Sequence, residues 1–370
     1  MRIERVTLHV VRLPLKVPYV TSGSTETHEA HVLARVESDG QVGWGESIAP
    51  ERPWYSGETT STVLLALEEF LLPALFAADL AGPEDTALRF AHVRDHRMAK
   101  ATLEMAVWDL FAKRAGLPLA ALLGGTRERI PCGVAIGLKP TLGELVATIE
   151  RELLAGYQRV KVKIRPGEDL TVARAIRAHF PALDFMVDAN SAYTLDDIEL
   201  FRAIDETGPM MIEQPLAHDD LVDHATLQAA LRTPLCLDES VHTADDARKA
   251  IQIRAGRIVN IKPGRVGGHA EAKRVHDVCA AAGVPVWCGG MLEMGIGRAH
   301  NVHVSSLPNF SLPGDVAASA RYFETELIGE PFVVMADGTM QVPSGPGIGV
   351  TVLEDVIRRV AEHSREHRPD

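Results

Sequence analysis

Five ionisable residues recur at nearly constant spacing in the second half of this chain. Lys163, Asp188, Glu213, Asp238 and Lys262 are separated by 25, 25, 25 and 24 residues, and each ends a short apolar run. An interval of this length holds one strand, one helix and their loops, so the same structural position recurs. Burying charge at strand ends carries a large desolvation cost, which makes a purely structural ion-pair network a poor explanation. We predict that these five side chains converge on one catalytic site.

The three acids of this series have the chemistry of a site for a hard divalent cation. Carboxylates leave coordination positions for water and substrate oxygens, which suits Mg²⁺, and Mn²⁺ or Co²⁺ can substitute. Zinc prefers His or Cys, and the 15 His of the chain form no His-Glu-x-x-His motif. We therefore expect Asp188, Glu213 and Asp238 to bind a divalent metal, and a His-ligated metal hydrolase is a poor interpretation of the barrel.

The lysines of the series predict proton transfer. Alternation along a strand places Lys161 and Lys163 on one face. With Cys132–Leu138 as strand 1, Lys163 is on strand 2 and Lys262 on strand 6, which lie opposite each other in a closed eight-strand ring. A substrate carboxylate on the metal would then hold its α-carbon between two amines. One amine removes the proton and the other returns it from the opposite face, which inverts the stereocentre.

A lysine must be neutral to act as a base, so its pKa has to fall. We expect the metal to lower the pKa of both lysines, with Lys161 assisting at Lys163 and Arg265 at Lys262, because like charges disfavour the charged form. The metal would also stabilise the enediolate that forms when the α-proton leaves.

The sequence also predicts the elements that position these groups. From Ile130 onward, apolar runs alternate with amphipathic stretches, and we expect strands at Cys132–Leu138, Arg159–Ile164, Phe185–Asp188, Met210–Glu213, Leu235–Asp238, Ile258–Lys262 and Val284–Cys288, with a weaker one within 304–314. This alternation predicts a parallel α/β fold, and eight strands favour a TIM barrel with its active site at the C-terminal strand ends. No Gly-x-Gly-x-x-Gly follows the first strand, so a dinucleotide-binding fold is not favoured.

The two ends of the chain have a different pattern of apolar residues from the middle. Residues 1 to 50 alternate like an antiparallel meander, and helical patterns follow at 60–76 and 99–115. We predict an α/β protein with a modified TIM barrel over 126–324 and an α+β capping domain over 1–125. Residues 325–370 return to the capping domain through a hairpin around Asp337-Gly338, a short helix near 352–363 and a charged tail.

The bulk composition limits the partners of the protein. The chain has 370 residues, of which 46% are hydrophobic, and a net charge of −12. An acidic surface does not favour nucleic acid or an anionic membrane, and no window approaches the roughly 18 apolar residues of a membrane span. The N-terminus lacks the apolar segment of a signal peptide, and the four cysteines form no Cys-x-x-Cys pair. We predict a soluble cytoplasmic protein that acts on a small-molecule carboxylate.

Taken together, these residues resemble a known superfamily. The Lys161-Val162-Lys163 pair, the three acids and Lys262 are similar to the core set of the enolase superfamily, and more narrowly of its muconate-lactonizing-enzyme subgroup. That resemblance implies a Lys or His base that works with Mg²⁺ against an enediolate. The stretches Ile261–Gly268, Gly289–Gly297 and Leu307–Asp315 further resemble the N-succinylamino acid racemase / o-succinylbenzoate synthase family. The resemblance covers essentially the whole chain.

This resemblance implies roles for individual residues. Lys163 and Lys262 would be the acid/base pair, with Lys161 supporting Lys163. Further residues would surround the metal and the substrate: Asn190 and Glu239 beside the metal, Gly290, Met291 and Glu293 on the acyl side, Ala135 and Ile136 at the pocket floor, and Tyr19 over the substrate. Two turns of the capping domain, Pro18–Gly23 and Ala49–Gly57, would be lids. A homo-oligomer is implied as well.

The resemblance leaves several reactions open. The leading one is racemisation of N-acylamino acids, above all N-succinyl ones, together with dehydration to o-succinylbenzoate. The alternative is that this dehydration, in menaquinone synthesis, is the main role, since both lysines serve either reaction. A dipeptide epimerase or cycloisomerase is less favoured, because Gly314–Ala318 lacks the second Asp of the Asp-x-Asp that epimerases offer. A non-catalytic binding protein on this fold disagrees with the intact set of acids.

Overall fold

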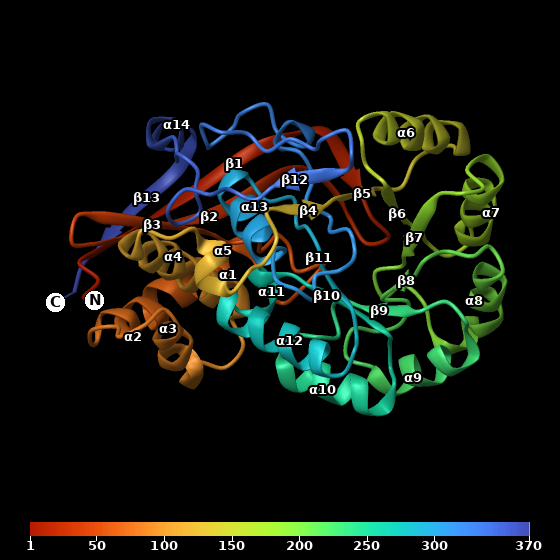
Figure 1. Cartoon of the computed structure of the whole chain (residues 1–370), viewed down its shortest axis with the longest axis horizontal. Coiled ribbons are helices and arrows are strands. Elements are labelled where there is room, and N and C mark those ends of the chain that lie inside the picture. The colour runs from red at the N-terminus through yellow and green to blue at the C-terminus, as the bar shows by residue number, and fades with distance from the viewer. Residues whose placement is uncertain (370) are drawn as a thin grey trace.

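The chain folds into an antiparallel sheet with its own helices and a parallel sheet ringed by helices. The computed structural model describes residues 1–369. In Figure 1 the first group of helices, α1 to α4, lies to the left, and α6 to α10 follow one another around the right-hand side, outside the parallel strands. The two termini lie close together at the left edge. This is an α/β fold with a separate antiparallel cap, as the sequence predicts.

The cap sheet has four strands in the order β13-β1-β2-β3. They are β1 (Arg5–Val20), β2 (Thr25–Ser38), β3 (Gln41–Glu46) and, from the other end of the chain, β13 (Ala361–His367). The helices packed with them are α1 (Thr60–Ala66), α2 (Leu72–Phe76), α3 (Glu84–Arg89) and α4 (Arg97–Ala115), with a π-helical turn at Leu67–Leu71. Apolar positions of β2 such as Val32 and Ala34 pack against these helices.

The C-terminal end corrects the expectation of a charged tail. The short helix is present as α14 (Glu354–Val360), but the residues after it form β13, which pairs antiparallel with β1 from Val6–His367 to Val11–Ala361. The strand was missed because it is an edge strand whose side chains are mostly exposed and charged. Such edges commonly carry charges that discourage pairing with other chains, so they lack the apolar alternation of an inner strand.

The parallel sheet supplies seven strands in the order β11-β10-β9-β8-β7-β6-β5. They are β5 (Gly133–Ile136), β6 (Arg159–Lys163), β7 (Asp184–Asp188), β8 (Ile212–Glu213), β9 (Leu235–Leu237), β10 (Ile258–Ile261) and β11 (Val286–Cys288). The helices that follow them are α6 (Leu142–Leu154), α7 (Asp169–His179), α8 (Ile198–Asp205), α9 (Leu221–Ala230), α10 (Ala244–Ile253), α11 (Pro263–Val266), α12 (His269–Ala281) and α13 (Gly295–Val304), while α5 (Leu119–Leu123) precedes β5.

The weak eighth run within 304–314 forms bridges instead of a strand. Phe310 bridges Val286 of β11, and Gly314 bridges Cys132 just before β5, both in parallel orientation. The segment therefore joins the two edges of the seven-strand sheet into a ring. Pro308 and Pro313 have no backbone N–H to donate, which explains why a continuous ladder does not form there.

The expected hairpin around Asp337-Gly338 is wrong in its pairing. Its second arm, β12 (Thr339–Gln341), pairs antiparallel with β4 (Arg129–Pro131) at the entrance to the barrel, with Met340 opposite Ile130. Both of these apolar side chains are buried, so pairing with β4 covers them better than a free hairpin would.

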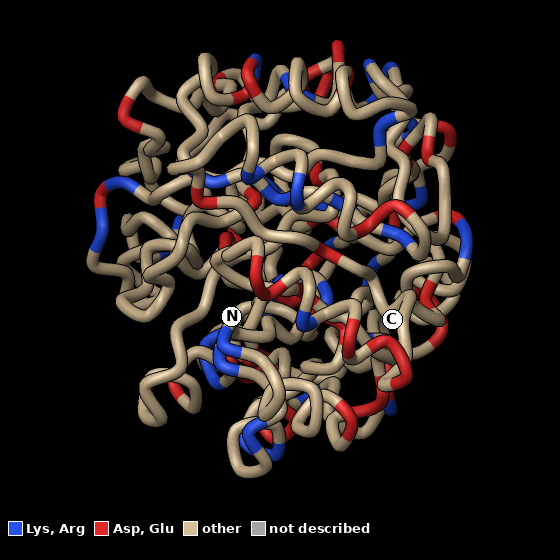
Figure 2. The backbone as a smooth tube through the Cα atoms, turned by 90° about the vertical axis from the view of Figure 1, so that its right-hand side faces the viewer, with Lys and Arg blue, Asp and Glu red and all other residues tan. Residues whose placement is uncertain are grey.

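Strand register brings the charged positions to one level. Lys163 lies beside Asp188 on β7, and Asp188 lies beside Glu213 on β8. Val160 and Val162 pack into the core between barrel and helices. Inside the ring, beneath the charges, lies a small apolar layer that includes Met186, Met211, Cys236, Ile258 and Trp287. The cysteines are free and buried, and among residues 1–369 no helix is long and apolar enough to cross a bilayer. Acidic and basic positions are interspersed in the view of Figure 2.

One buried acid fastens the cap to the barrel. Glu104 of α4 accepts hydrogen bonds from the backbone N–H of His269 (2.7 Å) and Ala270 (2.8 Å), at the N-terminus of α12. It also accepts one from Trp108 Nε1 at 2.6 Å. Burial raises the pKa of Glu104 to about 8, although the three donors oppose that rise.

This raised pKa predicts a pH-dependent contribution to stability. At pH values between 4.5, the ordinary pKa of a glutamate, and about 8, the folded state binds more protons than the unfolded state. Glu104 therefore makes its full contribution to the free energy of unfolding at pH values below its ordinary pKa. That contribution is lost as pH rises through the pKa of Glu104 in the folded state. We expect wild type to lose stability relative to Glu104→Gln between about pH 5 and about pH 8 in urea unfolding. A difference that does not change with pH would contradict this, and exposed Glu144→Gln is the control.

Candidate active site

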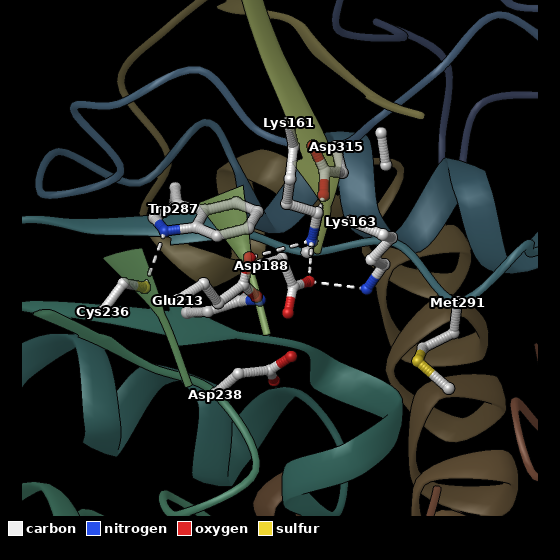
Figure 3. A network of polar contacts seen from close by, with 12 residues as sticks. Lys161, Lys163, Asp188, Glu213, Cys236, Asp238, Trp287, Met291 and Asp315 are labelled. Atoms are coloured by element: carbon white, nitrogen blue, oxygen red, sulfur yellow. Dashed lines mark hydrogen bonds and ion pairs between the residues drawn. The ribbon is translucent and has the colours of Figure 1, made fainter. Parts of the chain in front are cut away.

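The three predicted metal acids lie on neighbouring strands at the mouth of the barrel. Asp188 ends β7, Glu213 ends β8, and Asp238 directly follows β9. All three are fully or almost fully buried. Figure 3 shows Asp188 and Glu213 directed toward Lys161, with Asp238 on the far side of the same interior. The sequence prediction that these side chains share one end of the barrel agrees with this placement.

Lys161 lies at the centre of the acids. Its Nζ is 3.1 Å from Asp188 Oδ2, 3.0 Å from Glu213 Oε2 and 2.7 Å from Asp315 Oδ2. It also lies 5.0 Å from the centroid of the Trp287 ring, within cation–π range. Burial opposes its charged form, but the surrounding carboxylates outweigh this and raise the pKa of Lys161 well above its ordinary value.

Lys163 and Lys262 occupy opposite sides of this cluster. Lys163 Nζ donates to Asp188 Oδ2 and to Asn190 Oδ1, both at 2.6 Å. Lys262 Nζ donates to Asp238 Oδ2 at 2.8 Å and to the Tyr55 hydroxyl at 3.0 Å. Lys163 ends β6 and Lys262 follows β10, and the sheet order places β7, β8 and β9 between them. The two amines therefore face each other across the barrel mouth.

The protein groups around Lys262 shift its pKa, and the expected role of Arg265 beside it needs correction. Burial alone would lower the pKa of Lys262, but Tyr55 and nearby carboxylates outweigh it, so the protein groups raise this pKa. The Arg265 guanidinium pairs with Asp238 and donates to the carbonyl oxygens of Val241 (3.0 Å) and Asn260 (2.8 Å), while the Arg265 backbone N–H donates to the Lys262 carbonyl oxygen at 2.9 Å. Arg265 and Lys262 therefore pair with the same carboxylate, that of Asp238.

The donor set fits a divalent cation in type and charge. Glu213 Oε2 is buried and lies 3.0 Å from Lys161 Nζ, and its other oxygen accepts from Asn260 Nδ2 at 2.8 Å. Among the described residues no three Asp, Glu, His or Cys groups are drawn together as closely as metal ligation needs. Lys161, Lys262 and Arg265 pair with these acids. Three carboxylates at the ends of neighbouring strands supply hard oxygen ligands, which suit Mg²⁺.

A buried ion-pair layer beneath the site was missed by sequence reasoning. Asp315 joins two cations, since Arg159 Nη1 donates to its Oδ1 at 2.6 Å and Lys161 Nζ lies 2.7 Å from its Oδ2. Both cations lie about equally near Trp287, with Arg159 Cζ 4.9 Å from the ring centroid. Burial opposes ionisation, but Arg159 and Lys161 outweigh it and lower the pKa of Asp315 to about 2. Its only signal in the sequence is a place at the end of the eighth run.

We expect Asp315→Asn to be strongly destabilising. The change leaves two buried cations without their shared countercharge, and breaking a buried pair in this way costs about 3 kcal/mol or more. Urea unfolding measures the loss. Asp337→Asn is a matched control, because it removes the same charge from an Arg–Asp pair, with Arg129 at 3.2 Å, that is exposed. The control should change stability by less than about 1 kcal/mol, and equal effects would contradict the assigned role.

A cavity of about 220 Å³ opens above the lysines. Most predicted substrate residues line it: Tyr19, Ala135, Asn190, Glu239, Gly290 and Met291. Ile136 and Glu293 do not; Ile136 is in the core, and Glu293 Oε1 accepts from the Met291 N–H at 3.0 Å. Both expected lids contribute, through Tyr19 and its hairpin and through Trp54 and Tyr55.

Four non-glycine residues at this cavity or next to the three acids have a strained backbone. Asn190, Ser191, Gln214 and Leu292 have φ values of 44°, 61°, 36° and 57°, in the left-handed region that non-glycine residues rarely adopt. Gln214 is held there by its own side chain, whose Oε1 accepts from the N–H of Asp238 (3.0 Å) and of Ser240. Such strain persists where the surroundings fix it, and it is common at functional sites.

Comparison with known proteins finds relatives over the full length. Residues 3–124 match the N-terminal domain of the mandelate racemase / muconate lactonizing enzyme family, and residues 144–356 match its enolase C-terminal domain-like partner. The o-succinylbenzoate synthase of Geobacillus kaustophilus is 53% identical over 366 residues, covering 99% of this chain and 97% of that protein. The N-succinylamino acid racemase of Thermus thermophilus is 45% identical over 360 residues, covering 97% of each. A solved structure of an enolase superfamily member from Listeria innocua has a TM-score of 0.96 at 37% identity and full coverage of both chains.

Proposed function

Because the chain belongs to the enolase superfamily, within the mandelate racemase / muconate lactonizing enzyme family, we propose that it is a metal-dependent racemase of N-acylamino acids, N-succinylamino acids above all. We propose that it also dehydrates the precursor of o-succinylbenzoate. The observation that carries the proposal is the placement of Lys163 and Lys262 on opposite walls of one cavity. Relatives carrying both names support a shared active site for the two reactions.

Each residue of the proposed active site has a separate role. Asp188, Glu213 and Asp238 would hold the metal, and a bound Mg²⁺ would supply positive charge beside the substrate carboxylate. Lys163 and Lys262 then lie on the two faces of the α-carbon, where one takes the proton and the other delivers one. Lys161 places a second positive charge beside Lys163. Asn190 orients the Lys163 amine by accepting its hydrogen bond at 2.6 Å. The lids and the ring of Tyr55 over Lys262 (4.8 Å) exclude water.

Racemisation and dehydration place different demands on the lysines. Racemisation uses both as acid and base. Dehydration needs one base, Lys163, while Lys262 need only stabilise charge. The alternative, that o-succinylbenzoate synthesis for menaquinone is the main role, is favoured by the 53% identity to an o-succinylbenzoate synthase. A dipeptide epimerase is disfavoured, because Gly314–Ala318 lacks the second Asp and Asp315 itself pairs with Arg159 and Lys161.

The test uses the wild-type protein with Mg²⁺ or Mn²⁺. N-succinyl-L-phenylglycine is incubated in D₂O while optical rotation and α-deuteration are followed. We expect rotation to decay to zero with deuterium entering both enantiomers. No exchange of the α-proton would contradict the racemase proposal, and turnover of only the o-succinylbenzoate precursor would favour the alternative. We further expect a cytoplasmic homo-oligomer, and light scattering tests its oligomeric state.

A further inference from the structure

The cap side of the cavity carries acids that the proton transfer does not use. Glu26 and Glu29 of β2 line the same cavity as Lys163 and Lys262. Glu29 is only 7% exposed. Among the described residues, the nearest charged contact of its carboxylate is His31 Nε2 at 3.6 Å, which is beyond hydrogen-bond distance. Buried polar groups in folded proteins nearly always have hydrogen-bond partners, so beyond its ion pair with His31 this carboxylate has acceptor capacity left for a group in the cavity.

Strand alternation explains why Glu29 faces the barrel. Glu29, His31 and Leu33 share one face of β2, and Leu33 packs in the core of the barrel. The intervening Val32 and Ala34 pack against the cap helices on the other face. The end of β2 nearest the hairpin therefore turns its carboxylate toward the barrel mouth, where the substrate would lie.

A buried cation behind Glu29 offsets part of the cost of its charge. His31 Nδ1 lies 2.7 Å from Glu46 Oε1, and Glu46 accepts from the N–H groups of Met294 (2.7 Å) and Gly297 (2.6 Å) at the start of α13. Burial lowers the pKa of His31, but the two carboxylates outweigh it and raise it to about 10. His31 is thus a fixed imidazolium between Glu29 and Glu46. Burial nevertheless raises the pKa of Glu29, so a second cation nearby would stabilise its charged form.

Other charges near this wall are already paired or lie at the rim. Glu51, whose charge also reaches Glu29, pairs with Arg12 at 2.7 Å. Arg52 lines the cavity from an exposed position. The acyl end of an N-succinyl substrate is itself a carboxylate, which Glu26 and Glu29 would repel. The group that lies against this wall is therefore the side chain of the amino acid and not the acyl group.

We propose that Glu29 is a specificity-determining residue that selects N-acylamino acids whose side chains end in a cationic hydrogen-bond donor, an ammonium or a guanidinium. This inference rests on the proposed racemase function and names its substrate class. The exposed Trp54 and the half-buried Tyr55, which line the same cavity, offer ring faces along which such a cation can pass.

The test compares two substrates that differ only in this group. N-succinyl-L-lysine and N-succinyl-L-norleucine have side chains of the same carbon length, and only the first ends in an ammonium. Their kcat/KM for α-deuteration is measured with wild type, Glu29→Gln and Glu37→Gln, all in the metal-loaded protein. Glu37 is a matched control, because it lies on the same strand and the same face as Glu29 but outside the cavity.

We expect wild type to prefer the lysine substrate by about tenfold or more, as a charge-assisted hydrogen bond allows. Glu29→Gln should reduce that ratio by about tenfold, mostly through KM, and Glu37→Gln should leave it unchanged. Glu29→Asp should restore part of the ratio. Equal losses for both substrates in Glu29→Gln, or no preference in wild type, would overturn the selectivity while leaving the racemase proposal intact. No exchange with either substrate would overturn both.

Discussion

Replacing either of the two proposed catalytic lysines with alanine is expected to abolish the proposed racemisation, by about 10⁴-fold in kcat. The loss is large because inversion needs a proton taken from one face and delivered to the other. Lys163 and Lys262 provide the two amines of the cavity that lie on opposite strands of the ring. Each variant removes one face, so neither can complete the reaction however well it binds the substrate. Polarimetry on N-succinyl-L-phenylglycine measures the loss.

The same two variants should separate the two reactions. Lys163→Ala should lose dehydration to o-succinylbenzoate as well, because Lys163 is the expected base. Lys262→Ala should keep measurable dehydration, since its amine only stabilises charge in that reaction. Lys249→Ala, at an exposed site on α10, is the control and should alter neither. Equal losses of both reactions in Lys262→Ala would assign it a base role in dehydration too.

The second large effect is expected from the three acids. Asp188→Asn, Glu213→Gln and Asp238→Asn should each weaken Mg²⁺ binding by more than about 100-fold and lower kcat by about 10² to 10³-fold. Each change removes a negative oxygen at the proposed metal site and takes one anionic partner from a buried ammonium, as at Lys161 beside Glu213. Isothermal titration calorimetry measures the metal affinity, and chelation of the wild type should reproduce the loss of activity.

A matched control separates metal binding from general charge effects. Asp184→Asn removes a carboxylate from the same strand as Asp188, but at its exposed first residue, away from the site. It should bind Mg²⁺ like the wild type. Undiminished Mg²⁺ affinity in all three variants would contradict the assignment of these acids as ligands.

The features of this molecule that could be predicted from the sequence are those whose residues recur at a regular spacing. The charged strand ends recur once per strand–helix unit, so spacing alone predicts that Lys163, Asp188 and Glu213 lie on one level, and the observed register agrees. The barrel follows from the same repeat. The cap meander and the helix at 99–115, observed as α4, were equally predictable from alternation and helical spacing.

The features that could not be predicted depend on contacts between distant residues. Asp315 meets Arg159 across 156 positions, and nothing local in either segment indicates the pair. Likewise, nothing in the sequence around Glu29 indicates that this acid of β2 lines the cavity, because that depends on how the cap packs on the barrel. Strand β13 has no apolar period because it pairs along one edge only. Tyr55 and the carboxylates around Lys262 raise its pKa, which the sequence did not indicate, while the lowering expected from a bound metal stays a prediction.

The central claim is that the two lysines act on opposite faces of one carbon. The most direct measurement is α-deuteration of the separate L and D enantiomers of one N-succinylamino acid in D₂O by the two single-lysine variants. Each variant keeps one amine, so Lys163→Ala should exchange the proton of only one enantiomer and Lys262→Ala that of only the other. Exchange of the same enantiomer by both variants would contradict the opposed arrangement.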